Sequence, residues 1–91
     1  MSTNNVVPVD AFARRGLRSL RSERFKRKDF ARRLGISVQS LANIERGHRK
    51  LLAAELLLFA YGMNETPQWV LEEILRRFKD EIGQWRQESG Y

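Results

Sequence analysis

The chain has 91 residues, with 17 Lys and Arg against 11 Asp and Glu, a formal net charge of +6 and no cysteine. This length provides for one domain with a single modest core, and the lack of cysteine excludes disulfide frameworks, thiolate metal sites and cysteine nucleophiles. The most apolar run, 51–61, is too short to span a bilayer and contains Glu55, so we expect a cytoplasmic protein with no membrane partner.

The basic residues are concentrated in the middle of the chain. Residues 14–50 hold 13 Lys and Arg against 3 acids, whereas residues 51–91 hold 4 against 7. This segregation is typical of a protein with one part facing a polyanion and a separate structural or partner-binding part.

The apolar residues follow helical spacing almost throughout, and no strand pattern is convincing. Residues 1–9 are expected to form a flexible arm. Asp10 can cap a first helix that runs to about Arg24, with Leu17 and Leu20 on its inner face.

Two short helices follow, joined by a tight turn. The first is expected over 27–34 and is poorly capped, because Lys26 stands where Ser, Thr or Asp is preferred. Gly35 supplies the turn, and Ser37 is the predicted N-cap of a helix that extends to about Arg46. This arrangement is a helix-turn-helix, the unit that lays its second helix in the DNA major groove.

Two further helices are expected in the C-terminal half. The fourth runs from about Leu52 to Tyr61, and Thr66 with Pro67 opens a fifth that extends to about Glu88. Apolar residues recur along the fifth helix at spacings of 4, 3, 4 and 3, the a/d pattern of a helix that packs against a partner helix. The pattern predicts a homodimer, and the alternative is that the helix folds back over the first and fourth helices. The predicted dimer-interface residues are Leu71, Leu75, Phe78, Ile82 and Trp85.

Four segments of the chain, in their order and spacing, resemble the Cro/repressor-like (XRE) family of helix-turn-helix proteins. The resemblance implies an all-α, five-helix lambda-repressor-like domain over 10–71. Residues 72–91 extend the last helix beyond what the family needs for its core, and the a/d pattern makes them the predicted dimerisation element. It also implies a bacterial or phage origin and an association with the nucleoid. The segments are Leu17–Arg21, Phe30–Ser37, Leu41–Gly47 and Thr66–Leu71.

The first turns of the third helix carry the predicted base-reading residues. Gln39 and Asn43 lie four residues apart on one helix face, and both amides can bond adenine in pairs. Val38 is suited to a thymine methyl group, and Ser40 shares the first turn. The family places base-reading residues at the positions that match Val38, Gln39 and Asn43. The alternative is that these are ordinary solvated polar residues.

Cations on either side of this helix are predicted to contact phosphates, which position a protein without reading sequence. The alternative is a basic loop that only aids solubility. Family resemblance further implies an ion pair between Glu45 and an arginine of the first helix, which maps to Arg21. The predicted phosphate-contacting residues are Arg27, Ser37, Arg46, His48, Arg49 and Lys50.

No catalytic residue, cofactor, metal site or small-molecule ligand is predicted. The lone His48 has no second His or Cys nearby to complete a metal site. The expected function is a homodimeric transcription regulator of repressor type that binds an inverted repeat in double-stranded DNA. Two other possibilities remain open: a protein-binding adaptor that uses the same fold, and a DNA-packaging protein of low specificity.

Overall fold

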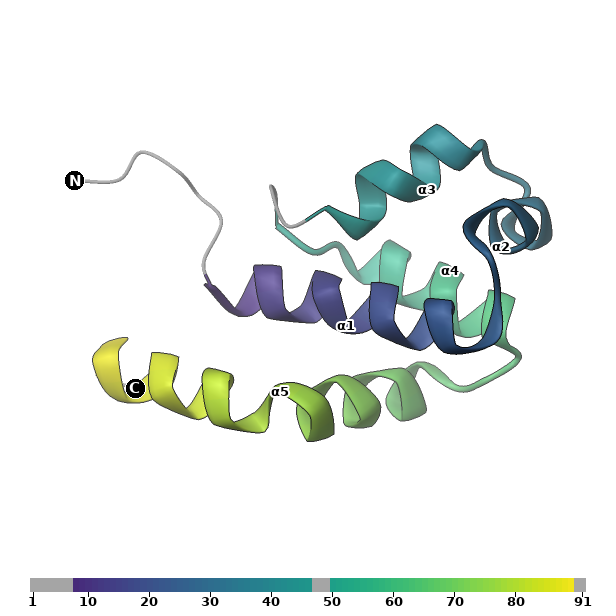
Figure 1. Cartoon of the computed structure of the whole chain (residues 1–91). Helices are drawn as coiled ribbons and strands as arrows, with labels where there is room; N and C mark the ends of the chain where they lie inside the picture. The colour runs from purple at the N-terminus through teal and green to yellow at the C-terminus, as the bar shows by residue number, and fades with distance from the viewer. Residues whose placement is uncertain (1–7, 47–49, 90–91) are drawn as a thin grey trace.

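The computed structural model describes residues 8–46 and 50–89, and these residues form five α-helices and no strand. The all-α, five-helix prediction is therefore confirmed. α1 and α5 run side by side over most of their length, and α2 and α3 pack together at one end of the molecule (Figure 1). None of the described helices is both long and apolar enough to cross a membrane. The helices are α1 (Pro8–Arg24), α2 (Arg27–Leu34), α3 (Val38–Glu45), α4 (Ala53–Met63) and α5 (Pro67–Ser89).

Local sequence signals set most helix ends. Gly35 has φ 72° and ψ 28°, the left-handed conformation that glycine adopts at little cost, and its backbone turns the chain from α2 toward α3. Asn64 ends α4 in the same conformation. Ser37 and Thr66 cap α3 and α5, since their hydroxyl oxygens accept hydrogen bonds from backbone N–H groups three residues later, each at 3.0 Å. These predicted signals are confirmed.

The hydrophobic core lies where all five helices meet. Its aromatic centre is the pair Phe30 and Phe59, whose ring centroids lie 5.2 Å apart and connect α2 to α4. Burial of each large apolar side chain contributes about 1.5–3 kcal/mol of transfer free energy. The other large buried members are Leu17, Leu20, Leu41, Ile44, Met63, Val70 and Ile74.

The fold-back alternative describes the first half of α5. Ile74 packs so closely on α1 that a Cβ at Gly16 would lie 2.8 Å from its Cγ1. The Phe78 ring stacks on Phe12 of α1, with centroids 6.2 Å apart. Phe78 also has non-helical φ and ψ of −121° and 24°, so α5 is kinked there. Phe78 is therefore half-buried against α1, and its place in a dimer interface stays a prediction.

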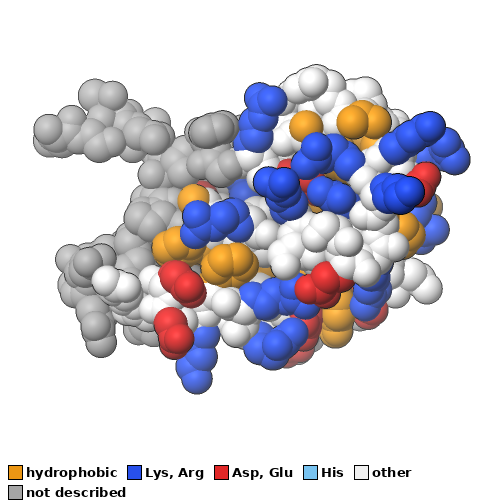
Figure 2. Space-filling view, in the orientation of Figure 1, with side chains coloured by type: hydrophobic (Ala, Val, Ile, Leu, Met, Phe, Trp, Pro, Cys, Tyr) orange, Lys and Arg blue, Asp and Glu red, His pale blue; other side chains and the backbone are white. Residues whose placement is uncertain are grey.

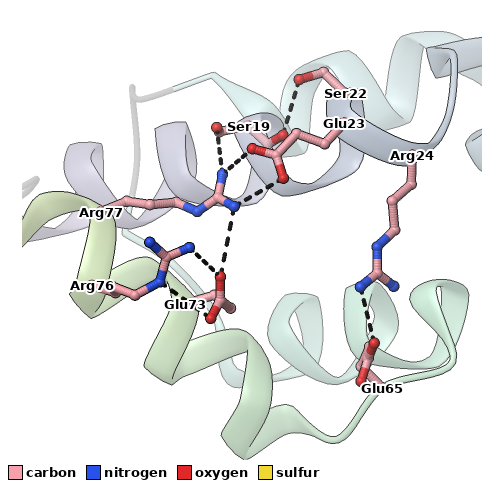
Figure 3. Close-up of polar contacts among 8 residues, drawn as sticks. All are labelled: Ser19, Ser22, Glu23, Arg24, Glu65, Glu73, Arg76 and Arg77. Carbon is pink, nitrogen blue, oxygen red and sulfur yellow. Dashed lines mark hydrogen bonds and ion pairs between the residues drawn. The ribbon is translucent and has the colours of Figure 1, made fainter.

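A polar contact also attaches α5 to α1. The guanidinium of Arg77 donates to Ser19 Oγ at 2.9 Å and to both carboxylate oxygens of Glu23, and it lies 3.6 Å from Glu73 (Figure 3). The hydrogen bond from Arg77 lowers the pKa of Glu23 below its ordinary value. At a pH above the pKa that this carboxyl has in the unfolded chain, the contact stabilises the fold in full. The stabilisation is lost as the pH falls through the lowered pKa of the folded state.

Two predicted boundaries shift. α1 begins at Pro8, so Asp10 lies in its first turn rather than at the N-cap. Its carboxylate instead accepts a hydrogen bond of 2.7 Å from Leu51 N, just before α4. The prediction that Asp10 caps the helix is wrong, because the helix starts two residues earlier. The core continues past Leu71 to Ile74, and the predicted arm lies, except for its last two residues, outside the described part of the chain.

Candidate nucleic-acid interface

α3 has one face in the core and one face in solvent. Leu41 is completely buried and Ile44 is 8% exposed, so these two side chains fix the helix against the domain. Val38, Gln39, Ser40 and Asn43 are exposed on the opposite side. All four predicted base-reading residues therefore lie on the surface, within two turns of one short helix.

Two of these side chains are joined to each other. Gln39 Nε2 donates a hydrogen bond of 3.2 Å to Asn43 Oδ1, so the two amides lie in contact along the helix. The bond leaves the Gln39 carbonyl as an acceptor and the Asn43 NH₂ as a donor. An acceptor beside a donor matches the donor and acceptor that adenine presents in the major groove.

Cations border the exposed face of α3. Arg46 directly follows the helix and Lys50 lies at the start of the segment that leads to α4; both side chains are exposed. In Figure 2 Lys and Arg side chains lie over α1, α2 and α3, and others lie lower in the view, over α5, beside Asp and Glu side chains. His48 and Arg49 lie outside the described residues. Among the described residues, no group of His, Asp or Glu is arranged to hold a metal ion.

Arg27 has a more constrained position than its prediction as a phosphate contact implies. Its Nε donates a hydrogen bond of 3.2 Å to Glu45 Oε1, and its side chain is 37% exposed. A side chain already bonded to a carboxylate has less freedom to reach a phosphate. The described part of the chain also gives α2 no side-chain cap at Lys26, as expected from the sequence.

Glu45 is the buried acid at the end of α3, and it meets Arg21. Arg21 Nε donates to Glu45 Oε2 at 2.8 Å and Nη2 donates to Oε1 at 2.9 Å, a bidentate pair of 7% and 2% exposed side chains. Arg21 also donates to the carbonyl of Phe25 at 3.2 Å. The pair joins α1 to α3 and so contributes to the orientation of the candidate reading face.

A second buried cation was missed in the sequence. Arg14 is completely buried, and its guanidinium donates to Glu55 Oε1 at 2.8 Å and to the carbonyls of Ile44 and Lys50. The available signal was spacing: Arg14 lies three residues before Leu17 and seven before Arg21, on the inner face of α1. An isolated acid in the apolar run of α4, Glu55, was the matching signal.

The predicted dimer residues are placed in different settings. Leu71 and Leu75 are 44% and 53% exposed on α5, whereas Phe78 packs against α1. The side chains of Ile82 and Trp85 lie outside the described part of the structure. The structure therefore leaves two large apolar side chains on the surface of α5, one helical turn apart.

Comparison with known proteins gives the family of the domain that carries this surface. No curated protein and no solved structure matches the chain. A family model described as "Helix-turn-helix" matches residues 17–70, which cover α2, α3, α4, the C-terminal part of α1 and the start of α5. This match covers more than half of the chain, and the family is a non-catalytic DNA-binding one. The chain therefore belongs to the Cro/C1-type (XRE) family of helix-turn-helix DNA-binding proteins.

Proposed function

We propose that the protein is a sequence-specific transcription regulator of repressor type that binds an inverted repeat as a homodimer. In this proposal α3 enters the major groove, and Val38, Gln39, Ser40 and Asn43 contact base edges. The observation that carries the proposal is the exposed face of α3, where two amides are bonded to each other and exposed cations follow the helix at Arg46 and Lys50. The proposed phosphate contacts are Arg27, Ser37, Arg46, His48, Arg49 and Lys50.

Selection from a randomised duplex library at physiological salt tests this function. We expect enrichment of an inverted repeat, whose half-site spacing gives the distance between the two copies of α3. Retention that is sensitive to salt but without enrichment would favour DNA packaging over regulation. The absence of any retained duplex would favour a protein-binding adaptor.

Substitutions of Gln39 and Arg46 separate base readout from phosphate contact. Gln39→Ala is expected to relax the preference at one base position by about 1–3 kcal/mol and to leave non-specific binding nearly intact. Arg46→Ala is expected to weaken binding to all DNA sequences alike. It should also reduce by about one the salt slope, which is the slope of the logarithm of the binding constant against the logarithm of the salt concentration. Binding titrations on the selected site and on single-base variants, at several salt concentrations, measure both quantities. The reverse pattern would show that the two roles are exchanged.

The exposed apolar residues of α5 support the proposed homodimer. Leu75 of α5 is 53% exposed, and Leu75→Glu places a charge there. Leu57 of α4 is 57% exposed, so Leu57→Glu is a matched control with the same charge outside the proposed interface. We expect Leu75→Glu to sediment as a monomer where the wild type is a dimer, and to bind the inverted repeat about 10²-fold more weakly because avidity is lost. A wild-type chain that stays monomeric at micromolar concentrations would remove the dimer from the proposal.

A further inference from the structure

Backbone atoms at the end of α3 and just before α4 are bonded to charged side chains of α1 and α4. Arg14 of α1 donates to the carbonyl of Ile44, in the last turn of α3, and to the carbonyl of Lys50. One guanidinium therefore holds two backbone oxygens that lie six residues apart. Its charge is balanced by Glu55 of α4, 2.8 Å away.

The backbone N–H groups that follow Lys50 are held in the same way. Asp10 accepts a hydrogen bond of 2.7 Å from Leu51 N, and Glu55 Oε1 accepts one of 2.9 Å from Leu52 N. Three consecutive residues thus each have a backbone polar atom bonded to a charged side chain from α1 or α4. The bond from Leu52 N to Glu55 is the usual contact between the N-cap of a helix and its third residue, whereas Arg14 and Asp10 bind the two residues before it from α1.

Core stability alone does not call for such an arrangement. Apolar residues of similar volume often stabilise a fold as well as a buried ion pair does, whereas buried charges fix a particular geometry. Here the bonds fix the backbone at Lys50. The side chain of Lys50 is exposed and is one of the proposed phosphate contacts. Charged side chains that touch no DNA would then determine where this cation meets the backbone of the duplex.

We propose that Asp10, Arg14 and Glu55 form a positioning network that places Lys50 against a DNA phosphate. The inference rests on the proposed DNA-binding function and names residues that act through Lys50 rather than on DNA. It carries a counterintuitive consequence. Removing the negative charge of Asp10 should weaken DNA binding, although long-range electrostatics alone would strengthen it.

Asp10→Ala tests the network, with Asp29→Ala as a matched control. Both residues are acids in the first turn of a helix, and both substitutions raise the net charge by one. With folding verified by circular dichroism at the assay temperature, we expect Asp10→Ala to bind duplex about five- to tenfold more weakly at 0.1 M salt, the contribution of one phosphate contact. Its salt slope should fall by about one, and Asp29→Ala should bind as well as or better than wild type.

A combined variant distinguishes positioning from general loosening of the fold. In a Lys50→Ala background, Asp10→Ala should change affinity by less than about twofold, because the contact that it positions is already absent. If Asp10→Ala does not fold, Arg14→Lys replaces it as the test. Lysine keeps the charge but lacks the branched guanidinium that reaches both carbonyls, so the same loss of DNA affinity is expected. A folded Asp10→Ala with wild-type affinity and slope would overturn the network. Wild-type protein that binds no duplex would overturn the proposed function itself, and this inference with it.

Discussion

Arg14→Met is expected to lower the free energy of unfolding by about 3–5 kcal/mol, the cost of breaking a buried ion pair by removing one partner. The carboxylate of Glu55, whose side chain is 7% exposed, would remain in the interior without the guanidinium that faces it. The carbonyls of Ile44 and Lys50 would also lose their donor. A domain of this size has a total stability of roughly 5–14 kcal/mol, so the variant would lose about a fifth of it or more.

Thermal melts with a matched control measure this effect. Arg18→Met makes the same substitution one turn later on α1, at an exposed position. We expect the midpoint of Arg14→Met to fall by roughly 12 °C or more, at about 4–8 °C for each kcal/mol, and that of Arg18→Met to change little. Equal midpoints for the two variants would mean that the buried contacts of Arg14 contribute no net stability.

The double variant Arg14→Met/Glu55→Leu resolves what the ion pair contributes. Replacing both charges by apolar side chains removes the buried carboxylate that has lost its guanidinium, so this variant should be more stable than Arg14→Met alone. Recovery should be partial, because the carbonyls of Ile44 and Lys50 still lack the guanidinium and Leu52 N has lost its acceptor. A double variant as unstable as the single one would place the cost on these backbone groups rather than on the charges.

The order and type of the helices were predictable because local signals agree with the global fold. Gly35, Ser37, Asn64 and Thr66 each supply a conformation or a hydrogen bond that the chain needs at that point, whatever surrounds it. The face of α3 follows from helical spacing alone, since Leu41 and Ile44 fix which side is buried. These features depend on residues within a few positions of one another.

The features that the sequence did not reveal depend on contacts between distant segments. Arg14 stands beside Arg15 in a run of basic residues, and its burial results from the approach of Glu55, 41 positions away. The start of α1 was misplaced because Asp10 is a good N-cap by type, whereas its carboxylate bonds to Leu51 N. The side of α5 that meets α1 depends on the pairing of Phe78 with Phe12.

Glu45→Ala is expected to cost about 3–5 kcal/mol as well, at the limit for a fully buried pair. The substitution leaves Arg21, a 7% exposed guanidinium, without its bidentate partner inside the domain. It also releases Arg27, which the same carboxylate holds at 3.2 Å. Two arginines would then lie close together without an intervening negative charge, so their repulsion adds to the loss.

Two companion variants assign the loss to the buried arginine rather than to the exposed one. Arg27→Ala removes only the 37% exposed partner and should cost less than about 1 kcal/mol, because solvent screens that pair. Glu45→Gln keeps the shape of the side chain and one acceptor oxygen, so its thermal midpoint should lie between those of the wild type and Glu45→Ala. An unchanged midpoint in Glu45→Ala would exclude the ion pair as a stabilising link between α1 and α3. The reading face would then be oriented by the apolar contacts of Leu41 and Ile44 alone.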